Sequence, residues 1–253
     1  MPQGMSLHIG LNSVDPNHYE GWDGTLVACE NDANDMQKTA SSLEYESKKL
    51  LTTEATRSAV IDAIAKAANQ LKGDDIFFLT YSGHGGQVPD TNGDDTDGKD
   101  ETWVLFDAEV VDDELHELYT RFKAGTRIVV LSDSCHSGTV TRAYRRIAPV
   151  EAEVGVRPHA DTRFRVMPSE VQAKVNQRYK KDLDRIQEAT KAAVTREPEA
   201  TVLLISGCQD RQTSADGDVN GLFTEMLLKV WNNGSFQQDY RHFQKAIKRR
   251  MPR

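Results

Sequence analysis

A histidine and a cysteine each follow a short apolar run of the sequence. His84 lies in Ser-Gly-His-Gly after the run 76–79, and Cys135 lies in Asp-Ser-Cys-His-Ser-Gly after the run 128–131. Both runs have the length and composition of buried strands. Because ligands and catalytic groups gather beyond the carboxyl ends of strands in an open parallel sheet, we expect the two side chains to face one crevice.

This pair of side chains predicts nucleophilic catalysis. A free thiol is only a few per cent thiolate at neutral pH, and a neighbouring imidazole can take its proton as attack proceeds. We therefore predict Cys135 as the nucleophile and His84 as the base. Hydrolysis would pass through a thioester, with the oxyanion held by the backbone N–H groups of Gly85 and Cys135. His136, next to the nucleophile, is predicted to be a structural residue or a residue at the rim of the site, and both catalytic loops are expected at the surface.

Alternating apolar patterns predict the elements that position this pair. Strands are expected at 7–12, 49–51, 76–79, 103–106, 128–131 and 201–206, and helices at 31–43, 56–71, 111–122, 221–231 and 240–250. Strands that alternate with helices are typical of a mostly parallel central sheet flanked by helices, an α/β fold of three layers.

Length and composition exclude several classes of protein. A chain of 253 residues is long enough for one large domain. A net charge of −8 argues against a nucleic-acid surface, and the sequence has neither a long apolar span nor a secretory signal, so we expect a cytoplasmic protein with no membrane partner. The three cysteines, Cys29, Cys135 and Cys208, are too few for a disulfide framework and lack the spacing of a zinc site. Oligomeric state stays open.

The two motifs together resemble those of metacaspases, which are caspase-like cysteine peptidases. His84 precedes Cys135 by 51 positions, close to the offset of about 50 found in caspases. The resemblance extends from Leu7 to about Arg250 and implies a caspase-like fold. By this resemblance, 1–150 would form the large-subunit-like half of a single peptidase domain, 151–200 a helical linker, and 201–253 the small-subunit-like half. The final edge strand of the family would be either missing from this half or replaced by another element that covers the edge.

The resemblance also implies a specificity. Metacaspases receive arginine or lysine in an acidic pocket, whose matching residues here are Asp32 and Asp133, with Ser82 and Cys29 beside them. A buried cation is tolerated only when it is paired, so two carboxylates that converge would select against uncharged side chains. An alternative for Asp32 alone is a cap at the N-terminus of the helix 31–43.

Acidic residues after the histidine motif raise the question of calcium. The run 90–101 does not fit an EF-hand loop, because Asp95 stands where the glycine is needed. Calcium-dependent metacaspases bind the ion through a different set of aspartates, whose nearest matches in this chain are Asp100, Asp112 and Asp113. The position of the fourth ligand is occupied here by Arg142. Because that cation would repel the ion, we expect no required cofactor. A calcium site that these aspartates form stays an alternative, and the other interpretation of the run is a solvated acidic loop.

The segment 169–198 is the most unusual part of the chain. Ser169 and Gln172 have the spacing of a capping box, and an apolar stripe continues from Val171 to Ala193, which predicts a helix packed on the domain. A regulatory role is the alternative, because this linker offers basic cleavage positions at Lys174, Lys180, Lys181, Arg185, Lys191 and Arg196.

The leading hypothesis is a cysteine endopeptidase that hydrolyses protein or peptide substrates after arginine or lysine. Two alternatives stay open: a caspase-fold peptidase that cleaves after asparagine or aspartate, and a caspase-like interaction module without catalysis. The two acidic pocket residues disfavour the first alternative, and the intact His84 and Cys135 disfavour the second.

Overall fold

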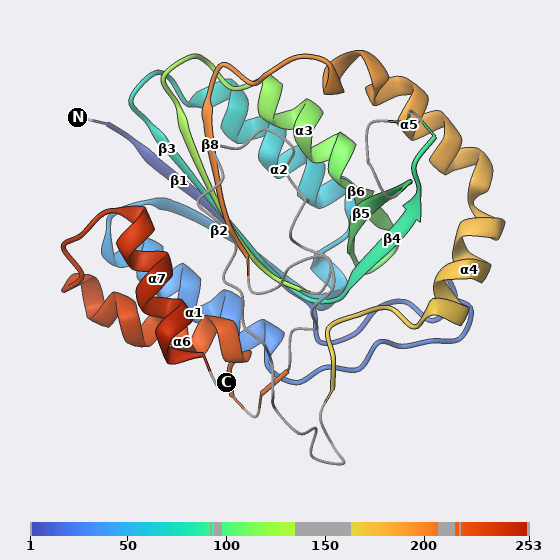
Figure 1. Cartoon of the computed structure of the whole chain (residues 1–253), viewed down its shortest axis with the longest axis horizontal. Helices are drawn as coiled ribbons and strands as arrows, with labels where there is room; N and C mark the ends of the chain where they lie inside the picture. Colours follow the sequence, from blue (N-terminus) through green and yellow to red (C-terminus); the bar gives the residue numbers. More distant parts are fainter. Residues whose placement is uncertain are drawn as a thin grey trace.

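A five-stranded parallel sheet forms the centre of the molecule in the computed structural model, which describes residues 2–91, 93, 98–134, 163–206, 216–217 and 219–251 (Figure 1). The strand order is β2-β1-β3-β7-β8. The bounds of these strands are Gly4–Gly10 for β1, Glu46–Leu51 for β2, Ile76–Ser82 for β3, Arg127–Asp133 for β7 and Thr201–Ser206 for β8. The predicted α/β class is confirmed.

Helices cover both faces of this sheet. One face packs against α2 (Arg57–Gln70) and α3 (Asp112–Thr120), whose side chains Ile64, Leu115 and Tyr119 join the main core. The other face packs against α1 (Cys29–Ser42), α6 (Leu222–Trp231) and α7 (Tyr240–Arg250), where Met36, Phe223 and Ile247 meet Leu131 of the sheet. The three layers are visible in Figure 1. Two short 3-10 turns, Thr52–Glu54 and Asn232–Gly234, connect elements.

The order of the strands in the sheet determines where a binding crevice can form. The chain places β2 on one side of β1 and β3 on the other, so the point where the strand order reverses lies between β1 and β3. In open α/β sheets such a point is where a binding crevice forms. The register pairs Ser82, the last residue of β3, with Asp133, the last residue of β7. The carboxyl ends of these two neighbouring strands therefore place polar side chains next to each other.

A small antiparallel sheet follows β3 directly. It consists of β4 (Gly85–Pro89), β5 (Lys99–Val104) and β6 (Glu109–Val111) in the order β4-β5-β6. The sequence predicts only the second of these strands. The glycine-rich start of β4, which we expected to be a loop, pairs Gly85 with Trp103 and Gly86 with Thr102.

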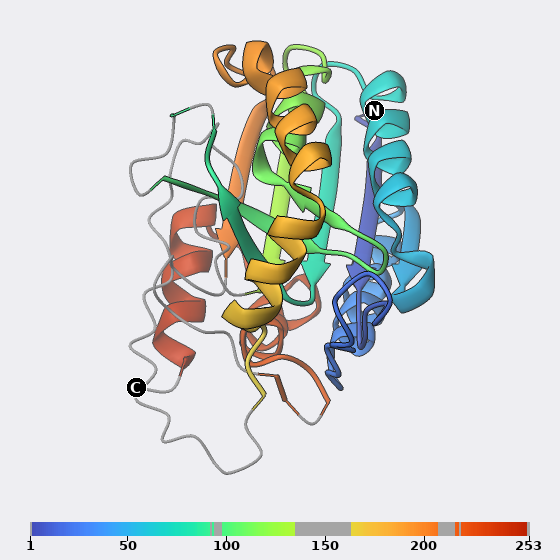
Figure 2. The same cartoon turned by 90° about the vertical axis from the view of Figure 1, so that its right-hand side faces the viewer.

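The described part of the linker, 163–200, contains two helices rather than one. They are α4 (Ser169–Arg178) and α5 (Lys180–Val194), and Figure 2 shows them running along the side of the molecule in front of the small sheet. The predicted capping box at Ser169 is wrong, because α4 has no side-chain cap there and the Gln172 amide reaches Glu109 instead. The apolar stripe does pack inward, with Val175 and Ala193 buried. Within the described residues, no helix is long and apolar enough to cross a membrane.

Candidate active site

His84 occupies the junction between β3 and β4. Its side chain is only 5% exposed, so the expectation of a catalytic histidine in a surface loop is wrong. The ring packs against Trp22 with a centroid separation of 4.7 Å, and Nε2 lies 2.9 Å from the carbonyl oxygen of Gly24. A carbonyl oxygen can only accept a hydrogen bond, so Nε2 carries the proton and is the donor to Gly24. Nδ1 is then the basic nitrogen of the ring.

The basic nitrogen of His84 is buried and has no hydrogen-bond partner among the described residues. The pKa of His84 is lowered to about 4, mainly by burial and also by the nearby charge of Arg165, although the backbones of Gly24 and Val166 act in the opposite direction. The imidazole is therefore neutral near pH 7, which is the form that a general base requires. Cys135 itself lies outside the described residues, two positions beyond the end of β7 at Asp133.

Asp32 and Asp133, which the sequence predicts to bind a substrate cation, both contact the guanidinium of Arg165, a residue of the chain itself. Its guanidinium lies 2.9 Å from Asp32 and 3.0 Å from Asp133, measured from nitrogen to carboxylate oxygen. A third carboxylate, Asp216, lies at 3.0 Å. The Arg165 side chain is 0% exposed, and a cation can be buried to this extent only when it is paired.

The other two predicted pocket residues lie beside these carboxylates. The Ser82 hydroxyl donates to Asp32 at 2.7 Å and accepts from Arg165 at 2.8 Å. Cys29 begins α1 and is completely buried, and burial raises the pKa of its thiol to about 12. Such a thiol is protonated at neutral pH and is a poor nucleophile.

Asp32 is not a helix cap. It lies inside the first turn of α1, and two of the free N–H groups at the start of that helix, those of Cys29 and Glu30, donate to the Asn12 side chain. The Asp32 carboxylate instead accepts from the Asn220 side chain and from the backbone of Gly221. Burial raises the pKa of Asp32 to about 6 even though the Arg165 charge acts to lower it.

The backbone of Arg165 is held as well as its side chain. The N–H of Gly85 donates to the carbonyl oxygen of Arg165 at 3.0 Å, and the N–H of Met167 donates to the carbonyl oxygen of Gly85 at 2.9 Å. Val166 thereby pairs with Gly85 as an isolated parallel bridge. The Gly85 N–H, predicted from the sequence as an oxyanion donor, therefore points at the carbonyl of an arginine whose side chain lies in the acidic pocket.

Three residues of this site could not be found from the sequence. Arg165 precedes the short apolar stretch Val166-Met167 and has no periodic pattern around it. Asp216 belongs to an irregular segment, where it also accepts from the backbone of Val27 and Ala28. Gly221 lies against the guanidinium so closely that an added Cβ would come within 2.5 Å of an Arg165 nitrogen. For Arg165, the one signal in the sequence was that a basic residue lies in a part of the linker without a helical pattern.

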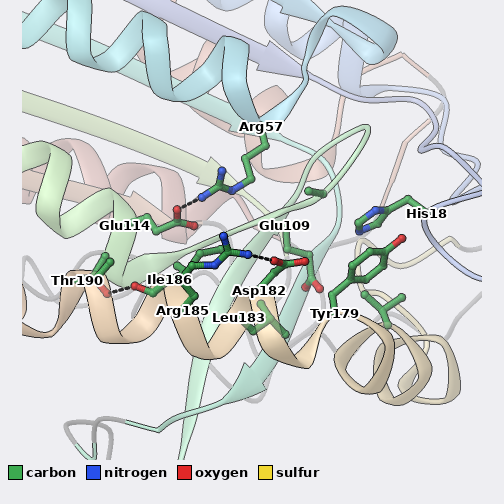
Figure 3. Close-up of a pocket in the computed structure, with 13 residues that line it drawn as sticks. His18, Arg57, Glu109, Glu114, Tyr179, Asp182, Leu183, Arg185, Ile186 and Thr190 are labelled. Atoms are coloured by element: carbon green, nitrogen blue, oxygen red, sulfur yellow. Dashed lines mark hydrogen bonds and ion pairs between the residues drawn. The ribbon is translucent and has the colours of Figure 1, made fainter.

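A second, larger hollow lies elsewhere and lacks this chemistry. It is a cleft of about 550 Å³ between α5 and the elements around α3, and Figure 3 shows the ion pairs Arg57–Glu114 and Arg185–Asp182 on its walls. Neither His84 nor any predicted pocket residue lines it. By contrast, the cavity that Asp32, Ser82 and Asp133 line together has a volume of about 10 Å³. The cleft is therefore not the predicted catalytic site.

The three calcium candidates are all fully buried. Asp100 accepts from the Gln187 side chain at 2.6 Å, and Asp112 and Asp113 lie in the first turn of α3. In the described part of the chain, no group of three or more His, Cys, Asp or Glu side chains is arranged to hold a metal. Arg142 lies outside the described residues.

We expect activity to depend little on calcium, because the cation Arg142 replaces an acidic ligand. The measurement is turnover of an arginyl peptide in chelator and in millimolar calcium. A hundredfold rise on addition of calcium would contradict this prediction, and magnesium at equal ionic strength serves as the control.

Fold and site together define a class: an α/β protein with a buried histidine and an acidic pocket at the carboxyl ends of parallel strands. Residues 14–253 match the family model described as the caspase domain, so the chain belongs to the caspase-domain family. The predicted family resemblance is confirmed.

Metacaspases are among the proteins that the chain resembles. It is 32% identical to Metacaspase-1 of Cryptococcus neoformans, over 87% of this chain and 52% of that protein, and 30% identical to Metacaspase-1 of Coccidioides immitis, over 88% and 52%. The chain thus spans about half the length of these curated relatives.

Solved structures share the fold. A crystal structure of a Geobacter sulfurreducens protein has 49% identity and a TM-score of 0.83, covering 99% of this chain and 90% of that one. Caspase-1 of Spodoptera frugiperda has 12% identity and a TM-score of 0.58, covering 97% and 75%. This second likeness concerns the fold alone.

Proposed function

We propose that the protein is a cysteine endopeptidase that hydrolyses peptide bonds after arginine or lysine. The proposal depends on the contacts of Arg165. Its guanidinium contacts three carboxylates, and its carbonyl oxygen accepts a hydrogen bond from the Gly85 N–H. A substrate residue on the acyl side of a scissile bond needs this combination, a recognised side chain and a carbonyl directed at an oxyanion donor.

Each residue of the candidate site then has a role in the proposed reaction. His84 Nδ1 takes the proton of the Cys135 thiol as the sulfur attacks the carbonyl carbon and later returns a proton to the leaving amine. The Gly85 N–H stabilises the oxyanion of each tetrahedral intermediate. Asp32, Asp133 and Asp216 hold the substrate cation, and water completes the reaction by hydrolysing the thioester. Protein or peptide substrates are implied, and the chain's own residues supply every group without a cofactor.

A panel of fluorogenic peptides that differ only at the acyl-side residue tests this proposal. We expect kcat/KM to be highest for arginine, with lysine next and uncharged residues far below, because the planar guanidinium can meet several carboxylates at once. Cys135→Ala is the control for contaminating proteases. Preference for asparagine or aspartate would favour another caspase-fold specificity. No hydrolysis of any peptide, together with no labelling of Cys135 by an arginyl ketone, would favour a non-catalytic module.

A further inference from the structure

Two aromatic side chains lie between the elements that carry the site. Tyr81, near the end of β3, and Trp103 of β5 stack with a centroid separation of 4.6 Å and an angle of 9° between the rings. Tyr81 is 1% exposed and Trp103 is 0% exposed. The register pairs Tyr81 with Ser132 of β7, so the stacked rings lie close to the carboxyl ends of both strands.

The Tyr81 hydroxyl holds the backbone of the histidine. A phenol has one proton, and the nearer acceptor is the carbonyl oxygen of His84 at 2.6 Å, whereas that of Val104 lies at 3.0 Å. A Cβ on Gly83 would lie 2.6 Å from the hydroxyl oxygen, so only glycine lets the turn approach this closely. Burial raises the pKa of Tyr81 well above its ordinary value, and the hydroxyl therefore keeps its proton at neutral pH.

The Trp103 indole connects this pair to the strand that leads to the nucleophile. An indole N–H can only donate, and that of Trp103 donates to the Ser132 hydroxyl at 3.2 Å. Because Ser132 accepts from the indole, we assign its own proton to the hydroxyl of Ser134, which lies 3.2 Å away. Ser134 directly precedes Cys135 in the sequence, and consecutive Cα atoms are about 3.8 Å apart. Fixing Ser134 therefore fixes the point from which Cys135 starts.

The backbone of Trp103 supplies a third link. In the small sheet Trp103 is the register partner of Gly85, whose N–H is the proposed oxyanion donor. The next residue, Val104, donates its N–H to the carbonyl oxygen of His84 at 3.1 Å. Trp103 is thus joined to the base through the stacked Tyr81, to the strand of the nucleophile through its N–H, and to the oxyanion donor through the small sheet.

We propose that Trp103, Tyr81 and Ser132 are positioning residues that align His84 with Cys135. This inference rests on the proposed function, and the three side chains act through their neighbours rather than on the substrate. Packing alone would account for a large aromatic side chain at position 103. It would not account for the direction of the indole N–H, because a phenylalanine would fill the same space without one.

Alignment affects the chemical step more than the binding of substrate. Proton transfer requires His84 Nδ1 within hydrogen-bond reach of the thiol, and a displacement of about 1 Å lowers catalysis by up to about a hundredfold. Asp133 lies between the two serines, but successive side chains of a strand point to opposite faces, and the backbone N–H and the hydroxyl of Thr224 both donate to Asp133. The acidic pocket should therefore keep its geometry when the bond from Trp103 is removed.

The first measurement is the pH dependence of Cys135 alkylation by iodoacetamide, followed by mass spectrometry on the otherwise unmodified chain. An aligned His84 assists the thiol at neutral pH, so the wild type should react well below pH 8.5, which is about the pKa of a free thiol. Trp103→Phe keeps a ring on Tyr81 but has no N–H. We expect this variant to react about tenfold more slowly at pH 7, with its profile moved toward that of a free thiol.

The second measurement separates kcat from KM on an arginyl peptide. Each variant also carries Arg165→Gln, because the Arg165 side chain otherwise lies among the pocket carboxylates. Trp103→Phe and Ser132→Ala should each lower kcat about tenfold and leave KM within about twofold, and Tyr81→Phe should act in the same direction. The double variant at positions 103 and 132 should lose no more than either single variant, because both changes remove the same hydrogen bond.

The choice of variants separates positioning from folding. Trp231→Phe is the matched control, because the same replacement is made in a hollow lined by Ile76 and Val129, near the amino ends of β3 and β7. It should leave the alkylation profile and kcat unchanged. Ser132→Ala removes a single oxygen atom, so it should fold even if Trp103→Phe does not, and thermal unfolding is measured for every variant.

The outcomes distinguish this inference from the proposed function. Lower stability of Trp103→Phe and Ser132→Ala with an unchanged alkylation profile would show that these side chains only pack. That result, or a raised KM with kcat unchanged, would overturn the positioning role while the proposed function stands. An Arg165→Gln parent that hydrolyses no basic peptide would overturn the proposed function, and the alkylation profiles would still decide whether the three residues act on the thiol.

Discussion

Replacement of Cys135 or His84 by alanine is expected to abolish peptide hydrolysis. In the proposed mechanism, Cys135 supplies the atom that forms the thioester, and His84 supplies the buried Nδ1 that accepts its proton. General acid–base catalysis contributes roughly 10²- to 10⁴-fold, so His84→Ala should lower kcat by at least that factor. The measurement is kcat on an arginyl peptide, made on chains that also carry Arg165→Gln.

Controls must separate catalysis from folding. The His84 ring packs against Trp22, so its truncation costs stability, on the order of 1–3 kcal/mol, and thermal unfolding should be measured in parallel. Cys29→Ala and His136→Ala should retain substantial turnover, since the Cys29 thiol has a pKa of about 12 and is not poised to react. Equal losses in all four variants, with unchanged unfolding temperature, would contradict this assignment of roles.

Neutralisation of a pocket carboxylate should reduce kcat/KM for arginyl peptides by about tenfold to a hundredfold or more. A charge-assisted hydrogen bond in a desolvated site contributes roughly 1.5–3 kcal/mol, and about 1.4 kcal/mol corresponds to one decade. The expectation applies to Asp32→Asn and Asp133→Asn and extends to Asp216→Asn, because all three carboxylates lie within 3.0 Å of the bound guanidinium.

The measurement requires an empty pocket, so each aspartate variant is combined with Arg165→Gln. Asp62→Asn, an exposed carboxylate on α2, is the matched control for the change in net charge. Labelling of Cys135 by a small uncharged thiol reagent should hardly change, because the nucleophile is untouched. Loss of activity on every peptide in equal proportion, charged or not, would contradict a role in specificity.

Stability should change in the direction opposite to activity in this background. Without the guanidinium, three buried carboxylates repel one another, so one Asp→Asn change should raise the unfolding temperature. The pH dependence has a defined sign. The pKa of Asp32 is about 6 in the folded chain with Arg165 present, above its ordinary 3.8, and removal of Arg165 raises it further. The folded Arg165→Gln chain then binds more protons than the unfolded one, so its stability should fall as pH rises through 6.

The periodicity of the sequence determined the frame of this site. Apolar runs predicted β3 and β7, and because neighbouring parallel strands end at the same edge of a sheet, the residues that follow them, His84, Ser82 and Asp133, were expected in one region. The observed register pairs Ser82 with Asp133. Bounds were accurate where burial is strongest, as for β8 at Thr201–Ser206, and less accurate for the partly exposed β2, which starts three residues before the predicted strand.

Only the tertiary structure determined what fills the pocket. Arg165 meets Asp32 across 133 positions of sequence and Asp216 across 51, and both Arg165 and Asp216 lie in irregular segments without a repeating pattern. Asn12, rather than a residue of the helix, accepts from two of the N–H groups at the start of α1. Patterns of polarity report which face of an element is buried. They do not report which distant charge will neutralise a buried carboxylate, because that choice depends on how loops meet once the sheet has formed.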